Sequence, residues 1–417
     1  MIADAGDRWL QSSPCLMSAL SPATRRTILL LSFATFSSMS VQRVCDAMLP
    51  ELARVFSVTL AQAAQVISVF AIVYGVVQFL YGPLGDRLGK FRIVTFTTLA
   101  CSVGSLLSAL ATSLDMLVLA RGLIALFAAA IVPLAMAWVG DAVRYEHRQE
   151  ALARVGLGTS LGIVAGQVIG GVLTDLLGWR WALALMALMF TVVGLLLWQD
   201  WRLQLAAAPR GLGQDQVKHT GFVRQALQIL TGPWSRVVLA VGVIEGAAGF
   251  GVFALWATHL HQTHGITLGA AGAIAALFGL GGMLYMSTAR LLIPRLGERG
   301  LVRIGVSIVG LGSVALAFMP MWQGAALASL LVGFGFFMFH NTMQLNATQM
   351  APSARGTSVT LFASSLFFGQ SMGVVAAAWL SERLGSAKVI ALSGVALVLL
   401  GFVFARALLR RDMLHQS

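Results

Sequence analysis

The feature that most constrains this chain is a series of apolar segments, each about 20 residues long, separated by short polar stretches. A helix of roughly 20 residues is long enough to cross the hydrocarbon core of a bilayer. Only 11% of the residues are charged, which is too few to cover a water-facing surface. The sequence therefore predicts an all-α membrane protein with about twelve transmembrane helices. They are expected near 27–49, 64–84, 92–112, 115–138, 151–174, 180–199, 236–258, 270–292, 301–319, 323–346, 356–380 and 386–408.

The longest polar interruption divides these helices into two sets of six. It runs over 200–235 and contains apolar residues at helical spacing between Phe222 and Leu230, which predicts an amphipathic helix on the membrane surface. The predicted divisions are a cytoplasmic N-terminal segment (1–26), a first six-helix bundle (27–199), a cytoplasmic linker (200–235), a second bundle (236–408) and a cytoplasmic tail (409–417).

The basic residues predict the orientation. With the N-terminus inside, all but six of the 28 Lys and Arg residues fall on the cytoplasmic side. Cytoplasmic loops of membrane proteins carry such an excess of positive charge. Both termini are therefore expected in the cytoplasm. The six exceptions are Arg43, Arg54, Arg121, Arg180, Arg383 and Lys388.

Two short motifs recur in the second half of the chain. The sequence Arg-Leu-Gly-Lys at 87–90 has a counterpart, Arg-Leu-Gly-Glu, at 295–298. The sequence Gly-Gln-x-x-Gly at 166–170 recurs at 369–373. The two motifs recur after 208 and 203 residues, and such similar distances indicate duplication of a six-helix unit. Internal repeats of this kind are a common construction in secondary transporters. We therefore expect two pseudo-symmetric bundles.

The turn after the second predicted helix carries the most specific motif. Gly82, Asp86, Arg87 and Gly89 stand at the spacing G-x-x-x-D-R-x-G, followed by basic residues. Here the chain resembles the major facilitator superfamily, whose signature continues x-[RK]-[RK]; Phe91 replaces one basic residue. The resemblance implies that these four residues form a conformational switch, which closes the cytoplasmic side in the outward-facing state. A turn that only fixes the topology is the alternative.

The fifth predicted helix contains a second family motif. Gly162, Gly166, Gln167, Gly170 and Gly171 resemble the antiporter motif G-x-x-x-G-P-x-x-G-G of the 12-helix drug:proton antiporter branch, with glutamine at the proline position. The resemblance implies a role in setting the direction of transport. The small residues by themselves predict close helix packing, and both interpretations remain open.

Four ionisable residues lie inside predicted helices and are candidates for proton coupling, because charge in a membrane is costly. Asp46 and Arg121 resemble helix-1 and helix-4 positions of the same branch, and Arg43 is spaced to pair with Asp46. Glu245 lies among glycines and alanines, and removal from water favours the protonated form of a carboxylate. We predict Glu245 as the proton carrier and Asp46 as the runner-up. An internal ion pair, or side chains that reach to the outer interface, is the alternative for Arg43 and Asp46.

Polar residues at the end of the tenth predicted helix are candidates for the substrate cavity. They are His340, Asn341 and Gln344, with polar contacts between helices as the alternative. Three further histidines, at 259, 261 and 264, are expected in a solvated loop rather than at a metal site. We expect no metal and no cofactor.

The resemblance implies a secondary active transporter that exports a small molecule in exchange for protons by alternating access. We expect it to act as a monomer in the bacterial inner membrane, with the substrate, protons and lipid as its partners. Nucleic acid is excluded, because the basic residues recur between apolar segments and do not cluster. No P-loop is present to supply ATP hydrolysis. The alternatives are a proton-driven importer of a small metabolite and a non-transporting membrane sensor. An enzyme is excluded, because no nucleophile and base or metal cluster lies at a matched depth.

Overall fold

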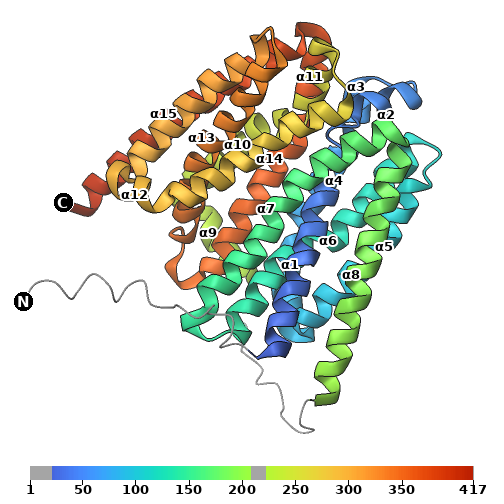
Figure 1. Cartoon of the computed structure of the whole chain (residues 1–417). Coiled ribbons are helices and arrows are strands. Elements are labelled where there is room, and N and C mark those ends of the chain that lie inside the picture. The colour runs from blue at the N-terminus through green and yellow to red at the C-terminus, as the bar shows by residue number, and fades with distance from the viewer. Residues whose placement is uncertain (1–20, 208–221, 417) are drawn as a thin grey trace, which may run out of the picture.

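The computed structural model describes residues 21–207 and 222–416, and it shows the predicted membrane helices. Ten helices in these ranges are long and apolar enough to cross a membrane. One of them, α12 (Leu268–Phe318), is two membrane helices joined at Gly297, where φ is 61°. The serine-rich α1 (Pro22–Arg43) adds a further membrane helix. The chain is therefore an all-α protein of twelve membrane helices in two sets of six (Figure 1).

Most of the other elements follow the predicted segments. In the first half they are α2 (Leu49–Val55), α3 (Leu60–Ala63), α4 (Gln65–Leu88), α5 (Lys90–Ala109), α6 (Leu114–Ala142), α7 (Tyr145–Leu176) and α8 (Trp179–Ala207). In the second half they are α9 (Phe222–Thr231), α10 (Pro233–Glu245), the π-helical turn η3 (Gly246–Gly251), α11 (Trp256–His264), α13 (Trp322–Thr348), the short turn η4 (Pro352–Ala354), α14 (Arg355–Leu384) and α15 (Ser386–Gln416). The helix predicted near 236–258 is divided into α10, η3 and α11, and the short elements α2, α3 and η4 were not predicted.

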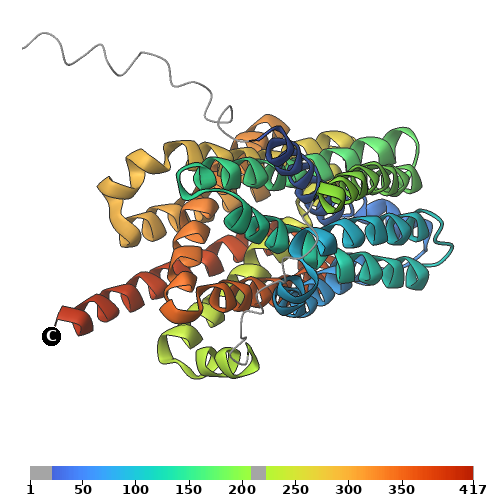
Figure 2. The ribbon, with the colours of Figure 1, turned by 90° about the horizontal axis from the view of Figure 1, so that it is seen from below.

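Two helix pairs form the interface between the halves. α7 packs beside α12, and α4 packs beside α14. Seen from below, the two bundles lie next to each other along this seam (Figure 2). In the first bundle α1 packs against α7, and in the second bundle α10 and η3 pack against α14.

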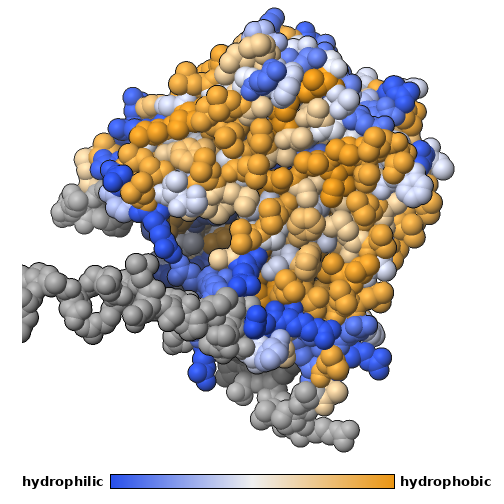
Figure 3. Space-filling model, in the orientation of Figure 1, coloured by the Kyte–Doolittle hydropathy of each residue, from blue (hydrophilic) through white to orange (hydrophobic). Residues whose placement is uncertain are grey.

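Hydrogen bonds join the halves at one end of the molecule, and Ser364 of α14 also bonds to Gln78 and Gly75 further along α4. At the end of α7, Asp175 accepts hydrogen bonds from the backbone nitrogens of Leu268, at 3.2 Å, and Gly269, at 2.6 Å, which cap the start of α12. Ser68 of α4 bonds to Ser371 of α14 at 2.9 Å. We call this the closed end and the end where α1 begins the open end. A recess edged by hydrophilic residues opens toward the open end in Figure 3, below the hydrophobic band.

Matching rows of glycines hold the inner helices close together. A Cβ atom on Gly166 would lie 2.9 Å from the Arg43 Cβ, so α7 fits against α1 only with a glycine there. In the second half, a Cβ atom on Gly373 would lie 2.5 Å from the Ala247 Cα. These small residues allow the backbones to approach, as they do in other membrane helix pairs.

Three sequence expectations need correction. The first helix ends at Arg43 rather than near residue 49, and Asp46 lies in the irregular turn that follows. The three histidines lie in the helix α11 rather than in a loop, and His259 is buried beside Ser386, with its Nδ1 2.9 Å from that hydroxyl. The helix α8 continues to Ala207, into the stretch predicted as linker. A helix does form at Phe222–Thr231, whereas 208–221 lie outside the described residues.

Candidate functional site

A buried polar cluster lies in the first half, around Asp46. Its carboxylate accepts a hydrogen bond from Arg43 Nη1 at 3.3 Å and one from Gln167 Nε2 at 2.9 Å. All three side chains are nearly inaccessible to solvent. The other carboxylate oxygen, Oδ1, has no hydrogen-bond partner among the described residues. The sequence predicted the pair of Arg43 and Asp46, but it did not predict the contact with Gln167.

Gln167, which stands where the related antiporter motif has proline, donates a hydrogen bond to Asp46. The glycine row places α7 directly against the end of α1, so the amide at this position reaches the carboxylate of Asp46. A proline would offer no donor there. The signal that identifies Gln167 is therefore a polar side chain within a glycine-rich packing motif.

Arg121 of α6 completes this cluster. Its Nη1 donates to the Val41 carbonyl at 2.7 Å and its Nε donates to the Val66 carbonyl at 3.3 Å. The guanidinium lies 4.3 Å from the ring centroid of Phe70. It is fully buried, and its Nη2 has no partner in the described part of the chain. Arg121 therefore holds a second positive charge near Asp46 without forming an ion pair with it.

The second half contains a buried acid and base. Glu245, the last residue of α10, lies with its Oε1 2.8 Å from Nδ1 of His340 on α13. Glu245 is fully buried and His340 is 7% exposed. Oε2 of Glu245 has no hydrogen-bond partner among the described residues. The sequence singled out both residues but placed Glu245 away from side-chain partners; the structure corrects this.

Aromatic rings surround His340 and help to bury the pair. The imidazole stacks on Phe336, with the ring centroids 5.8 Å apart and the planes at 12°. Phe250, Phe337 and Phe362 lie within 6.1 Å of it, centroid to centroid.

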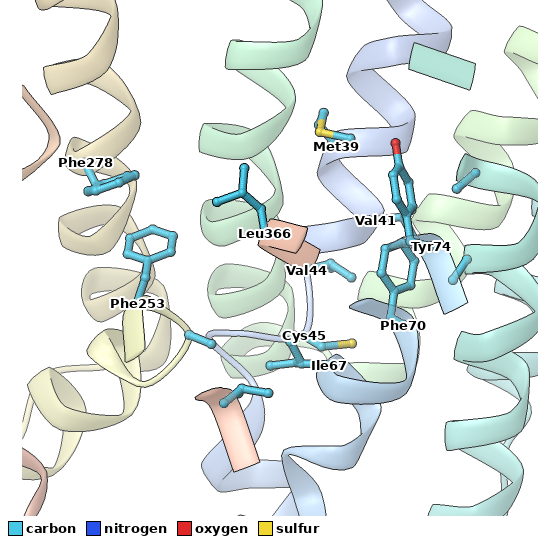
Figure 4. Packing of buried hydrophobic residues seen from close by; sticks show 14 of the residues in the cluster. Met39, Val41, Val44, Cys45, Ile67, Phe70, Tyr74, Phe253, Phe278 and Leu366 are labelled. Atoms are coloured by element: carbon cyan, nitrogen blue, oxygen red, sulfur yellow. The ribbon is translucent and has the colours of Figure 1, made fainter. Parts of the chain in front are cut away.

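Phe250 links the two clusters across the interface of the halves. It belongs to η3, the π-helical turn directly after Glu245. Its ring lies 5.9 Å from the imidazole of His340 and 5.0 Å from the Arg43 guanidinium. π-Helical turns are frequent at functional sites, because they change the direction in which a side chain points. Figure 4 shows the apolar packing at this level, with Val44 and Cys45 between Phe70 on one side and Phe253 on the other.

The motif turn lies at the open end. Gly89 has φ of 92°, a backbone conformation that favours glycine. Lys90 Nζ lies 3.1 Å from the Asp86 carboxylate and also contacts Asp141 at the end of α6. A Cβ atom on Gly82 would meet nothing within 4 Å, whereas one on Gly85 would lie 2.6 Å from Leu134 of α6, so α4 is packed on one face of this turn and open at Gly82. Arg87 is exposed.

The corresponding turn of the second half also contacts a neighbouring helix, but through an acidic residue instead of a basic one. Glu298, at the position that corresponds to Lys90, accepts a hydrogen bond from Asn346 Nδ2 at the end of α13, at 3.1 Å. Arg411 of α15 donates to Asn346 Oδ1 at 2.8 Å. The second copy of the motif therefore joins α12, α13 and α15 of its own bundle.

The remaining candidates separate into two groups. Gly162 packs on α1, with its built Cβ 2.9 Å from that of Met39, and Gly170 meets Val44 of the same segment. Gly171 instead faces Leu268 of the other half. Beyond His340, Asn341 is half-buried and Gln344 is exposed.

Comparison with known proteins identifies the family. The model of the Major Facilitator Superfamily matches residues 31–374. The chain therefore belongs to this superfamily of membrane transporters and is not an enzyme.

Several relatives match most of the chain. The uncharacterized MFS-type transporter YwfA of Bacillus subtilis is 25% identical over 307 residues, 73% of each chain. The putative multidrug resistance protein MdtD of Escherichia coli O1:K1 / APEC is 26% identical over 356 residues, 76% of this chain and 73% of its own. A shorter match, 28% identical over 45% of this chain and 36% of its own, is the MFS-type efflux transporter ffsH of Aspergillus flavipes.

Solved structures share the fold. A bacterial homologue of the human lysosomal transporter Spinster, in an inward-facing and unoccupied conformation, superposes with a TM-score of 0.74 at 19% identity, over 93% of this chain and 96% of its own. The nucleoside transporter NupG superposes with a TM-score of 0.73 at 14% identity, over 91% of this chain and 98% of its own.

Proposed function

We propose that this protein exports a small molecule from the bacterial cytoplasm in exchange for protons, as a monomer in the inner membrane. The observation that supports the proposal best is the buried pair of Glu245 and His340, which faces the Asp46 cluster through Phe250. Buried ionisable residues in membrane helices mark proton pathways. The efflux relatives favour export over import.

In the proposed cycle, Glu245 with His340 is the proton carrier. When the pair takes up a proton, the charge on the carboxylate or the imidazole changes, and so does the attraction between α10 and α13. Phe250 then transmits the rearrangement to Arg43, because its ring contacts both His340 and Arg43. In the present state Arg43 forms an ion pair with Asp46, and this pair would have to rearrange when the helices move. This couples a proton on one half to the position of the other half.

The present state is proposed to be inward-facing. The open end carries the excess of basic residues, which supports a cytoplasmic location for it by the positive-inside rule. The hydrogen bonds that join the halves through Asp175 and Ser68 lie at the closed end, on the outside. A substrate is then expected to enter between the bundles from the cytoplasm.

Both termini are expected in the cytoplasm. A reporter enzyme that is active only in the periplasm, fused after residue 417, should be inactive, whereas one that is active in the cytoplasm should work. A fusion in the turn between α7 and α8, at Gly178, supplies the matched periplasmic control. Periplasmic activity of the C-terminal fusion would contradict the proposed orientation.

The motif turn is proposed to be the conformational switch, with Gly82, Asp86, Arg87 and Gly89 as its residues. Asp86→Asn is expected to leave folding intact, because an exposed pair such as that of Asp86 and Lys90 contributes at most about 1 kcal/mol. Transport should nevertheless fall, since the charge at Asp86 is needed to close the open end. The measurement is the ratio of the two states, from distances between spin labels on α4 and α14, together with transport. Asp141→Asn is the control, because it removes the other acid beside Lys90. Unchanged turnover and an unchanged ratio of states would leave only a topological turn.

The direction of transport and the substrate class are tested by one screen. Cells that lack their major efflux pumps are expected to tolerate more of some toxic small molecule when they produce the protein. A protonophore should abolish the difference. Increased sensitivity, or accumulation of the compound that depends on the proton gradient, would instead support the importer.

A further inference from the structure

A pocket of about 520 Å³ lies at the open end, away from the ionisable clusters. It is formed between the beginning of α10 and the last turns of α15. Its walls are apolar and aromatic, from Trp234, Val237 and Val403. Three arginines also line it: Arg406, Arg410 and Arg411. No carboxylate is among the described residues that line this pocket.

The position of the pocket along α15 matches the edge of a bilayer. The helix begins at Ser386, and about 20 helical residues cross a hydrocarbon core of about 30 Å. The core therefore ends near residue 405. Val403 then lies at the level of the acyl chains, and Arg406 and Arg410 lie at the level of the headgroups.

Trp234 supports the same placement. Its ring stacks on Phe404, with the centroids 5.9 Å apart, and the Arg411 guanidinium lies 4.7 Å from a ring centroid of Trp234. Tryptophan is enriched at the boundary between hydrocarbon and headgroups. The pocket therefore has an apolar part on the side of the membrane core and a basic part on the side of the headgroups.

Arg406 and Arg410 supply the positive charge that the pocket offers to a ligand. Arg406 and Arg410 are exposed, and neither forms an ion pair with a carboxylate within the residues that the structure describes. The N-terminus of α10, which begins at Pro233 without a side-chain cap, adds partial positive charge. Arginine binds phosphate with two parallel hydrogen bonds, so the site suits a phosphate group.

We propose that this pocket binds an anionic phospholipid. The phosphate would lie between Arg406 and Arg410, and one acyl chain would run along Val237 and Val403. Basic pockets at the ends of membrane helices recognise such headgroups. A soluble phosphate compound would use the arginines but would gain nothing from the apolar wall.

The test compares the purified full-length protein with a pocket variant, Arg406→Gln with Arg410→Gln. Native mass spectrometry in detergent measures the affinity for phosphatidylglycerol and for phosphatidylcholine, and thermal unfolding is followed in parallel. The control variant is Arg290→Gln with Arg303→Gln, which removes the same charge from exposed positions of the same bundle. Inorganic phosphate and glycerophosphate supply the soluble arm.

The pocket variant is expected to bind phosphatidylglycerol roughly thirty-fold more weakly, from two arginines at a charged interface. The control variant should bind as the wild type does, and phosphatidylcholine should bind weakly to all three proteins. Equal weakening in the control, or stabilisation by inorganic phosphate as large as by phosphatidylglycerol, would overturn the proposal. If the pocket variant does not fold, a photoactivatable phosphatidylglycerol decides on the wild type: labelling must concentrate on 233–237 and 403–411, and labelling elsewhere refutes the site.

Discussion

Glu245→Gln is expected to abolish proton-driven transport while the protein still folds and exchanges substrate in the absence of a gradient. Glutamine has the shape of the protonated acid and can still hydrogen-bond to Nδ1 of His340, so the aromatic surroundings remain filled. It cannot release a proton, and the exchange cycle then lacks its carrier. Proteoliposomes with a pH-sensitive dye inside measure the proton movement, and labelled substrate measures exchange under the same conditions.

Two further variants sharpen this test. His340→Gln keeps Glu245 and removes its base, so it should change the pH at which transport is half-maximal without removing proton movement altogether. Phe337→Leu, at a ring that contacts His340 from a partly buried position, controls for packing of the surrounding rings. If Glu245→Gln transports against a gradient with normal pH dependence, Glu245 is structural and the carrier is elsewhere.

Asp46→Asn is expected to destabilise the protein strongly. Arg43 and Arg121 are both buried, and the carboxylate is the one acid that an ion pair joins to Arg43 in the described residues. Removing one partner of a buried pair costs about 3–5 kcal/mol, because the other charge remains without compensation. The measurement is the unfolding temperature in detergent, together with the yield of protein in the membrane.

A double variant separates charge balance from proton transfer. Arg43→Gln with Asp46→Asn removes both charges of the pair, so folding should recover relative to Asp46→Asn alone. If Glu245 is the carrier, pH-driven transport should persist in the double variant at a reduced rate. Loss of proton coupling in the double variant, combined with normal coupling in Glu245→Gln, would make Asp46 the carrier instead.

The sequence by itself determined the fold class. Hydrocarbon cannot hydrogen-bond a backbone, so each apolar segment of about 20 residues had to become a helix. The repeated motifs at 87–90 and 295–298 indicated the two bundles. The candidate residues were also visible singly, because an ionisable side chain such as Glu245 stands out in an apolar segment. The least accurate expectation was the end of α1, where apolar residues continue beyond Arg43 although the helix does not.

Beyond the local pair of Arg43 and Asp46, only the tertiary structure decided which of these residues meet. Glu245 and His340 are 95 positions apart, and Asp46 and Gln167 are 121 apart, so no local spacing relates them. The approach of their helices depends on glycines such as Gly166, whose missing side chain lets two backbones touch, and on the π-helical turn that aims Phe250. The spacing of these glycines predicts close helix packing, but it does not show which helix each glycine faces. That choice is made by the packing of the helices together, since the buried faces of each helix are filled by side chains from its neighbours.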